Sequence, residues 1–347
     1  MSTDETVTVA RGAHLVGSVP LADAAAVLKA ASSILGQHLR RIPDGETGVR
    51  TNWIGWQIAV MAGNPSLEPV PVDPAKYGTR ALFTLRQGVT AGDVHFDNLG
   101  YADAATGSYA IFSDMKQHGA IPSEVRFMVS LPTPLAPVAG FIALDAQAAV
   151  EPAYEARMFE ELDQICASIP HDQLAVQWDV AVEFGMLEGV WPVYFSNVRA
   201  EIIERLVRLS NRVPSDVEMG YHLCYGDAGH QHFKQPEDTT KLVDIANAVS
   251  RRVERAINWF HLPVPIDRDD DAYYAPLRQL QLHPETELYL GLVHIADGLE
   301  GSRRRAEVAA RHVATFGVAT ECGFGRRPPE TVPELMKIHA QLATAVR

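Results

Sequence analysis

The sequence predicts an α/β fold in which residues 1–347 form one closed (β/α)8 TIM-barrel domain. From residue 126 onward, strand-like apolar runs alternate regularly with helical patterns, and two further strand-like runs near the N-terminus bring the count to eight strands. A doubly wound open sheet is the competing fold. It requires a glycine-rich phosphate turn after the first strand, and the run from Gly17 to Pro20 does not supply one.

The N-terminal part departs from this regular alternation after its second strand. The apolar run His14–Pro20 stops at a Gly-Ser turn and a proline, which predicts the first strand, and the alanine- and leucine-rich segment Ala22–Leu39 has a helical period. Leu39–Glu46 reads as a brief strand that ends in acidic turn residues. Residues 47–122 are irregular and contain several glycines and prolines. We expect an insertion with its own helices that covers one mouth of the barrel, because an unstructured loop of that length would be implausible.

The remaining elements follow from hydrophobic period and turn residues. The predicted strands are Arg126–Pro132, Leu174–Val182, Val217–Cys224, Ile257–Pro263, Leu288–Ala296 and Gly317–Cys322. The predicted helices are Glu151–Ser168, Asn197–Asn211, Glu237–Arg255, Asp271–Leu282, Ser302–Phe316 and Val332–Val346.

Composition narrows the class of protein. The formal net charge of −13 and the pI of about 5.4 argue against nucleic acid as a partner, because such a field repels phosphate backbones. The sequence contains no run of about eighteen apolar residues, so it predicts no membrane span. Residues 1–9 lack the basic region of a signal peptide. Three cysteines are too few for a disulfide framework, so we expect a cytoplasmic protein with free thiols, of which Cys166 belongs to a helix core.

A candidate metal site begins with His222 and Cys224, two positions apart at the end of a predicted strand. Residues i and i+2 of a strand point to the same face, so an imidazole and a thiol project together. Cys322 ends the last predicted strand and is followed by glycine. One nitrogen and two sulfurs suit Zn²⁺, whose fourth ligand would be His261, at the end of the next strand, or a water or substrate atom. A strand His and Cys taken alone are more often buried structural residues.

Other polar residues also collect at the predicted carboxyl ends of the strands, where such barrels place their active sites. They are Gly17, Ser18, Asp44, Glu46, Asp179, His294 and Asp297. Asp44 and Glu46 fit either solvated turn positions or, for Glu46, contact with a substrate ammonium group. Asp179 needs a partner if buried, and a substrate amine or an arginine would serve.

Together these residues resemble the catalytic barrel of cobalamin-independent methionine synthase and its relatives, which include epoxyalkane:coenzyme M transferase. The likeness spans nearly the whole chain in order and is carried by Val16-Gly17-Ser18, Asp44-Gly45-Glu46, Gln177-Trp178-Asp179, His222-Leu-Cys224-Tyr225 and Cys322-Gly323. The resemblance implies zinc held by His222, Cys224 and Cys322. It also implies an amino-acid thiol whose ammonium and carboxylate groups are read near Gly17, Ser18, Glu46 and Asp179.

The chain departs from the family at several motifs. The family's fourth zinc ligand is a glutamate at the end of the sixth strand, where this chain has His261. The Gln-x-Asp-Glu-Pro motif reads Gln-Trp-Asp-Val-Ala from Gln177, and the Asp-x-His end of the seventh strand reads His294-Ile-Ala-Asp297. The N-terminal half of the full-length synthase, which helps to hold folate, has no counterpart among the residues that carry this resemblance. We expect a small-molecule thiol and an alkyl donor as partners, and the sequence leaves a folate-type donor and homo-oligomerisation open.

A thiol bound to zinc loses its proton near neutral pH and stays nucleophilic. The sequence therefore predicts a zinc-dependent methyl- or alkyltransferase that activates a thiol substrate as a zinc-bound thiolate for attack on an alkyl donor. His294 and Asp297 are candidates for the acid that protonates the leaving group, unless they only pack at the rim. The alternatives are a zinc hydrolase or lyase on the same barrel, which normally uses histidine and carboxylate ligands, and a non-catalytic ligand-binding zinc protein.

Overall fold

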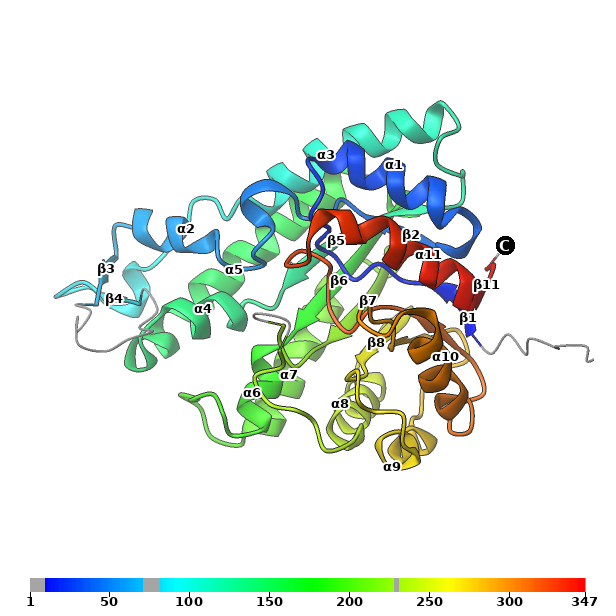
Figure 1. Ribbon diagram of the computed structural model, residues 1–347. Helices are drawn as coiled ribbons and strands as arrows, with labels where there is room; N and C mark the ends of the chain where they lie inside the picture. Colours follow the sequence, from blue (N-terminus) through cyan, green and yellow to red (C-terminus); the bar gives the residue numbers. More distant parts are fainter. Residues whose placement is uncertain (1–9, 71–81, 228–230, 347) are drawn as a thin grey trace, which may run out of the picture.

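The computed structural model describes residues 10–70, 82–227 and 231–346. Residues 1–9, for which the sequence predicts no signal peptide, and residues 71–81 of the expected insertion lie outside this part. Within these ranges the chain is an α/β protein with a curled, parallel nine-stranded sheet and eleven α-helices (Figure 1). None of these helices combines the length and apolar character that crossing a membrane requires.

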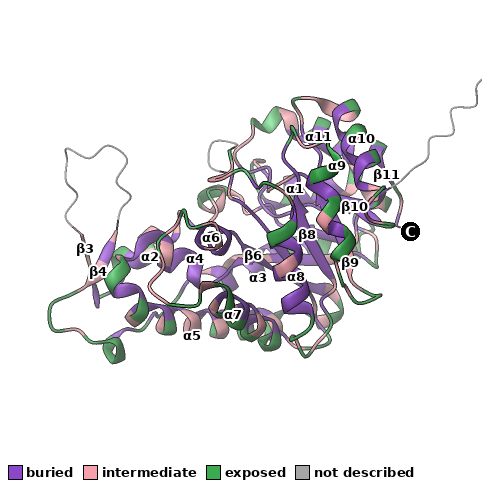
Figure 2. Cartoon of the chain, turned by 90° about the horizontal axis from the view of Figure 1, so that it is seen from below, coloured by how far each residue is buried: buried purple, intermediate pink, exposed green. Residues whose placement is uncertain are grey.

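The strands of the main sheet run in the spatial order β11-β1-β10-β9-β8-β7-β6-β5-β2, with parallel neighbours throughout. Their bounds are β1 Ala10–Ala13, β2 Arg41–Pro43, β5 Arg126–Pro132, β6 Leu174–Val180, β7 Glu218–Leu223, β8 Trp259–Pro263, β9 Glu287–Gly291, β10 Phe316–Val318 and β11 Ala343–Thr344. Most strand residues are buried on both faces (Figure 2). This double burial explains why the strands read as continuous apolar runs and not as alternating patterns.

The sheet curls without closing into the expected barrel. β11 adds a ninth strand beside β1, and among the described residues no ladder joins β1 to β2, the pairing that would close eight strands. A single isolated bridge between Ala13 and Leu39 crosses this seam. The prediction of a closed eight-stranded TIM barrel is therefore corrected to an open, nine-stranded half-barrel.

The first strand lies earlier than predicted, at Ala10–Ala13 instead of His14–Pro20. The predicted run is mostly buried, as its apolar residues indicate. However, the carbonyl oxygen of Val16 accepts hydrogen bonds from the side chains of Gln177 on β6 and Ser130 on β5, and not from the backbone N–H of a paired strand. The chain has therefore already left the sheet for the rim, where these residues can contact a ligand.

Most α-helices of the described residues cover the outside of the sheet, whereas α2 lies away from it beside β3 (Figures 1 and 2). Their bounds are α1 Ala24–Ile34, α2 Gln57–Gly63, α3 Tyr101–Gln117, α4 Leu135–Phe141, α5 Leu144–Ser168, α6 Val182–Leu187, α7 Val198–Arg212, α8 Thr240–Ser250, α9 Asp271–Tyr274, α10 Gly298–Ala309 and α11 Val332–Leu342. α1 begins where the side chain of Asp23 accepts a hydrogen bond from the backbone N–H of Ala26, a typical N-cap.

The segment 47–122 interrupts the alternation of strands and helices. It contains α2 and an antiparallel pair, β3 (Leu67–Pro69) with β4 (Phe83–Leu85), which lie at the end of the molecule far from the C-terminus (Figure 1). Its last helix, α3, contacts α1, α5 and β5, and so takes the place of the helix between β2 and β5. The role of the segment as a lid stays a prediction.

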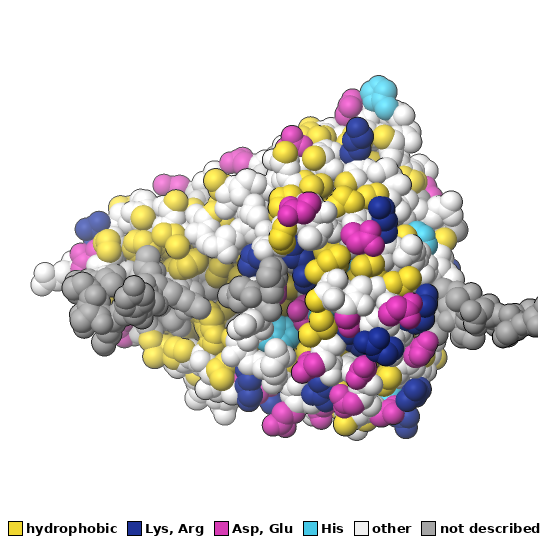
Figure 3. Space-filling model, viewed as in Figure 1, with side chains coloured by type: hydrophobic (Ala, Val, Ile, Leu, Met, Phe, Trp, Pro, Cys, Tyr) yellow, Lys and Arg dark blue, Asp and Glu magenta, His cyan; other side chains and the backbone are white. Residues whose placement is uncertain are grey.

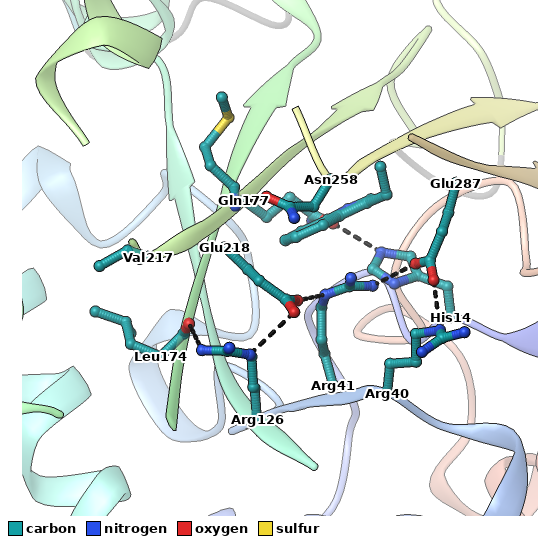
Figure 4. A network of polar contacts seen from close by, with 12 residues as sticks. His14, Arg40, Arg41, Arg126, Leu174, Gln177, Val217, Glu218, Asn258 and Glu287 are labelled. Atoms are coloured by element: carbon teal, nitrogen blue, oxygen red, sulfur yellow. Dashed lines mark hydrogen bonds and ion pairs between the residues drawn. The ribbon is translucent and has the colours of Figure 1, made fainter. Parts of the chain in front are cut away.

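A network of ion pairs lies at the amino ends of the strands (Figure 4). Arg41 at the start of β2 is 4% exposed and donates hydrogen bonds to Glu218 on β7 at 2.6 Å and to Glu287 on β9 at 2.8 Å. Arg126 on β5 also pairs with Glu218, and Arg40 pairs with Glu287. Because Arg41 belongs to an edge strand and reaches β9, these contacts hold the sheet in its curl.

Candidate metal centre

The candidate centre lies at the carboxyl ends of β7 and β10. His222 belongs to the last residues of β7, and Cys224 follows that strand directly. The N–H of Cys224 donates to the carbonyl oxygen of Val180 at 2.9 Å, so the strand pairing continues to this residue. The imidazole and the thiol therefore share one face. Cys322 lies in the loop that follows β10.

The structure brings these three side chains together. One ring nitrogen of His222 and the Sγ atoms of Cys224 and Cys322 all lie within 4.8 Å of one another. The two Sγ atoms are 3.9 Å apart. Two thiolates at about 2.3 Å from one tetrahedral zinc ion stand roughly 3.8 Å apart, so the thiol pair fits a shared ion. An imidazole with two sulfurs also favours zinc over harder cations such as magnesium.

The surroundings favour negative charge on the sulfur of Cys322, whereas the hydrogen bond that Cys224 gives to Cys322, together with burial, raises the pKa of Cys224. The thiol of Cys224 donates to Cys322, and Arg326 donates to the same sulfur from 3.4 Å; both lower the pKa of Cys322, against the effect of burial. Asp227 holds Arg326 in place through a contact of 2.9 Å. The N–H of Gly226 donates to Cys224 Sγ at 3.2 Å. Such donors stabilise thiolates, the form in which cysteine binds a metal.

His261, the predicted fourth ligand, does not join this group. Its Nδ1 lies 2.7 Å from Nδ1 of His222, and its Nε2 lies 2.9 Å from the carbonyl oxygen of Thr320. Both imidazoles are buried, and burial lowers the pKa of each, that of His261 to about 3. Both rings are therefore neutral at pH 7. His261 therefore contacts His222, one of the three candidate ligands, and does not itself belong to their group.

Gly17 and Ser18 lie in the loop after β1, which packs against the loop that carries Cys322. The N–H of Gly325 donates to the hydroxyl of Ser18 at 3.3 Å. A Cβ at Gly323 would lie 2.4 Å from Ser18 Oγ, so a side chain there would displace one of the two loops. The position of Cys322 thus depends on the rim loop in which we expected substrate-binding residues.

Two acidic candidates, Glu46 and Asp179, interact beside this loop. Burial raises the pKa of Glu46, and the nearby carboxyls of Asp179 and Asp44 raise it further. Burial also raises the pKa of Asp179, against a hydrogen bond of 2.9 Å from Gln177. Glu46 has a left-handed backbone with φ of 46°, which non-glycine residues rarely adopt. A cation bound here would be stabilised, because the charge of Asp179 disfavours the ionisation of Glu46.

Asp44 has a different set of contacts from Glu46. Its carboxylate accepts hydrogen bonds from Arg50 at 2.6 Å, from the hydroxyl of Ser108 at 2.7 Å and from the backbone N–H of Glu46 at 2.8 Å. These partners occupy a carboxylate that is largely buried. The geometry therefore favours Asp44 as a residue that fixes the turn of Glu46, and not as a direct substrate contact.

His294 and Asp297 are the two candidates for the acid that protonates the leaving group, and their contacts differ. His294 Nε2 donates to the carbonyl oxygen of Val264 at 2.8 Å, and burial lowers the pKa of the ring to about 3, so Nδ1 is unprotonated. Asp297 accepts two hydrogen bonds from the buried Arg305, at 2.6 and 2.8 Å. Burial acts to raise the pKa of Asp297, but the hydrogen bonds from Arg305 prevail and lower it. Asp297 is therefore ionised at neutral pH and has no proton to donate, which argues against its predicted role as an acid.

Glu321 is a rim residue that the sequence reasoning missed. Its carboxyl lies 3.4 Å from His232 Nε2 and 3.9 Å from His294 Nδ1, and burial raises its pKa to about 8. Its position directly before Cys322 was the available signal. Strand alternation would have turned it to the other face. β10 ends at Val318, however, so the residues after it are free of that alternation.

Other features lie away from the centre. Cys166 on α5 is a half-buried thiol against the hydrophobic core, and burial raises its pKa to about 11. A surface groove of about 630 Å³ is lined by Arg40, Glu287 and His312, among others, at the amino ends of the strands. On the face shown in Figure 3, acidic and basic side chains are interspersed over the part formed by the C-terminal helices. That part of the surface therefore presents no block of a single charge.

Comparison with solved structures finds the same fold. A structure described as a vitamin B12-independent methionine synthase from Listeria monocytogenes gives a TM-score of 0.57 at 12% identity, covering 96% of this chain and 97% of that chain. A B12-independent methionine synthase from Shewanella sp. W3-18-1, in complex with selenomethionine, gives a TM-score of 0.57 at 14% identity with the same coverage. No protein-family model and no curated protein matches the sequence. At these identities the likeness shows the fold alone.

Proposed function

We propose that this protein is a zinc-dependent methyl- or alkyltransferase that transfers an alkyl group to a small thiol. The observation that carries the proposal is the 3.9 Å separation of the thiols of Cys224 and Cys322 beside His222. A zinc ion held there would lower the pKa of an incoming thiol and keep it as a thiolate. Three ligands, the number grouped in the described part of the chain, leave one tetrahedral position open, as in catalytic zinc sites.

The thiol substrate in this proposal is an amino acid. Its ammonium group would lie between Glu46 and Asp179, where a cation relieves the unfavourable interaction of the two carboxyls. Its carboxylate would lie beside Gly17 and Ser18. The selenomethionine in the Shewanella structure supports this class, because it is an amino acid with a group-16 atom in its side chain.

In the reaction, the thiolate sulfur forms a bond to the alkyl carbon while the bond from that carbon to the donor's leaving group breaks. The leaving group then takes up a proton. Glu321 is the side chain that can deliver it, because burial raises its pKa to about 8 and keeps the carboxyl protonated at neutral pH, whereas His294 Nδ1, 3.9 Å from Glu321 Oε1, holds no proton. Asp297 has no part in this step, since its carboxylate is paired with Arg305.

The start of segment 47–122 would shield the substrate from water. Trp53, whose backbone φ is 49°, hydrogen-bonds to Asp179. Trp56 instead packs edge-on against Tyr101 within the segment, with ring centroids 4.8 Å apart. In this proposal Trp53 covers the bound thiol, whereas Trp56 and Tyr101 form the core of the segment.

Zinc X-ray absorption with and without added thiols tests the proposal. We expect about one tightly bound zinc per chain and one additional sulfur neighbour when an amino-acid thiol such as homocysteine is added. Cys224→Ser should lose the zinc, while Cys166→Ser, which removes a thiol remote from the centre, should retain it. Full activity in metal-free protein would refute the proposal, and cleavage of an ester or amide without any thiol would favour a hydrolase.

A further inference from the structure

We propose that His261 is a positioning residue that holds His222 with Nε2 free for the metal, and that it is not itself a ligand. The proposal rests on the metal site of the proposed function and concerns a residue outside its ligand cluster. Three groups form a chain of hydrogen bonds, namely the carbonyl of Thr320, the ring of His261 and the ring of His222. The proposal follows from deciding which atom donates and which accepts in each of these bonds.

The assignment begins at Thr320, whose backbone carbonyl oxygen can only accept. His261 Nε2, at 2.9 Å from that oxygen, must therefore carry a proton, which in an imidazole leaves the lone pair on Nδ1. His261 Nδ1 is then an acceptor, and the 2.7 Å contact with His222 requires that Nδ1 of His222 carries its proton. The lone pair of His222 is consequently left on Nε2. An imidazole whose other nitrogen donates to a fixed acceptor is the usual arrangement of a metal-bound histidine.

The distance between the rings agrees with a hydrogen bond and not with joint metal binding. Two imidazole nitrogens at about 2.0–2.1 Å from one tetrahedral zinc ion would stand roughly 3.3 Å apart. The observed separation of the Nδ1 atoms of His222 and His261 is 2.7 Å. Both nitrogens of His261 are also engaged, so ligation through either would break one of its two hydrogen bonds.

The same chain of contacts connects the two ligand-bearing segments. Thr320, which accepts from His261, donates from its hydroxyl to the carbonyl oxygen of Cys322 at 2.6 Å. A Cβ at Gly291 on β9 would lie 2.8 Å from His261 Nε2 and 2.8 Å from the Thr320 oxygen. The glycine therefore leaves the space in which this hydrogen bond forms. Through it, His261 ties the imidazole of His222 to the loop of Cys322.

The test compares metal binding in four variants with the wild type. His261→Leu removes both hydrogen bonds, and His261→Asn keeps an oxygen near the place of Nδ1 that can accept from His222. His222→Leu removes a ligand. His339→Leu is the matched control, because His339 on α11 is equally buried but contacts a carbonyl of its own helix. Affinity is measured by titrating metal-free protein with Co²⁺ and following the thiolate-to-cobalt absorption, and ligands are counted by zinc X-ray absorption.

We expect His261→Leu to weaken Co²⁺ binding about 10- to 100-fold with an unchanged count of nitrogen and sulfur neighbours at zinc. His261→Asn should lose less affinity, His222→Leu should lose a nitrogen neighbour, and His339→Leu should bind as the wild type does. An affinity of both His261 variants within twofold of the wild type would overturn the inference. So would the loss of an imidazole from the zinc spectrum of either, which would make His261 a ligand. If the wild type itself binds neither metal, the proposed function fails first.

Discussion

Glu183 allows a test of the rim that does not depend on a metal. It lies in the first turn of α6, is 1% exposed, and accepts a hydrogen bond from the hydroxyl of Thr133 through Oε1. Its Oε2 has no hydrogen-bond partner in the described part of the chain. Burial raises the pKa of this carboxyl from 4.5 to about 7, against the effect of Thr133. We predict that Glu183→Gln stabilises the protein at neutral and basic pH.

The sign and size follow from linkage. Below pH 4.5 both the native and the unfolded states hold the proton, and the side chain adds no pH dependence. Between pH 4.5 and about 7 the unfolded state ionises while native Glu183 stays protonated, so stability falls as pH rises. At about 1.4 kcal/mol per pH unit, this window corresponds to a loss on the order of 3 kcal/mol. Glutamine has the shape of the protonated acid and does not ionise, so the variant avoids the loss.

The assay is chemical denaturation of the wild type and Glu183→Gln from pH 4 to pH 8. The variant should match the wild type near pH 4 and exceed its free energy of unfolding by about 3 kcal/mol at pH 8. Glu307→Gln, an exposed position on α10, removes the same charge without burial and should give a difference that does not change with pH. If the difference for Glu183→Gln is equally flat, the assignment of a neutral buried carboxyl is wrong.

Three further substitutions separate structural from functional roles. Asp297→Asn leaves the buried charge of Arg305 without its counter-ion and should lower the free energy of unfolding by about 3 kcal/mol with little change in kcat; a large fall in kcat at unchanged stability would return Asp297 to a catalytic role. Glu46→Gln should raise KM about tenfold for an amino-acid thiol and not for a thiol without an ammonium group, which steady-state kinetics on both substrates decides. Arg41→Leu should cost about 3 kcal/mol in denaturant unfolding and leave zinc content unchanged, whereas loss of zinc would show that the amino-end network also shapes the site.

Local pattern predicted the buried strands well and the closure of the sheet poorly. The predicted strand Arg126–Pro132 is confirmed, and Leu174–Val182 is observed as Leu174–Val180, because strands buried on both faces read as continuous apolar runs. The helix predicted as Glu151–Ser168 starts earlier, at Leu144, and includes Pro152 within it. Closure depends on pairing between strands far apart in sequence, and no local period encodes it.

The candidate site was likewise predictable in part from the sequence. That His222, Cys224 and Cys322 would meet could be predicted, because the carboxyl ends of parallel strands gather at one rim. The partners of the neighbouring polar residues could not. Asp297 contacts Arg305 two helical turns away, and His261 contacts His222 across the register of β7 and β8, contacts that only the folded geometry selects. Residue type predicted which side chains could do chemistry, and packing decided which of them are committed to structure.

Gly291 lies on β9, between the strands that lead to the candidate ligands, and donates no ligand itself. A Cβ there would lie 2.7 Å from the Cα of Glu321 and 2.8 Å from both His261 Nε2 and the Thr320 oxygen, so Gly291→Ala must displace the loop of Cys322 or the imidazole. We expect a loss of about 1–3 kcal/mol in the free energy of unfolding and roughly tenfold weaker Co²⁺ binding. Gly63→Ala, at the end of α2 with open space around its Cβ, is the matched control and should change neither quantity. Wild-type metal affinity in Gly291→Ala would mean that the backbone between β9 and the Cys322 loop tolerates the added carbon, and that the hydrogen-bond chain through His261 does not set the geometry of the metal ligands.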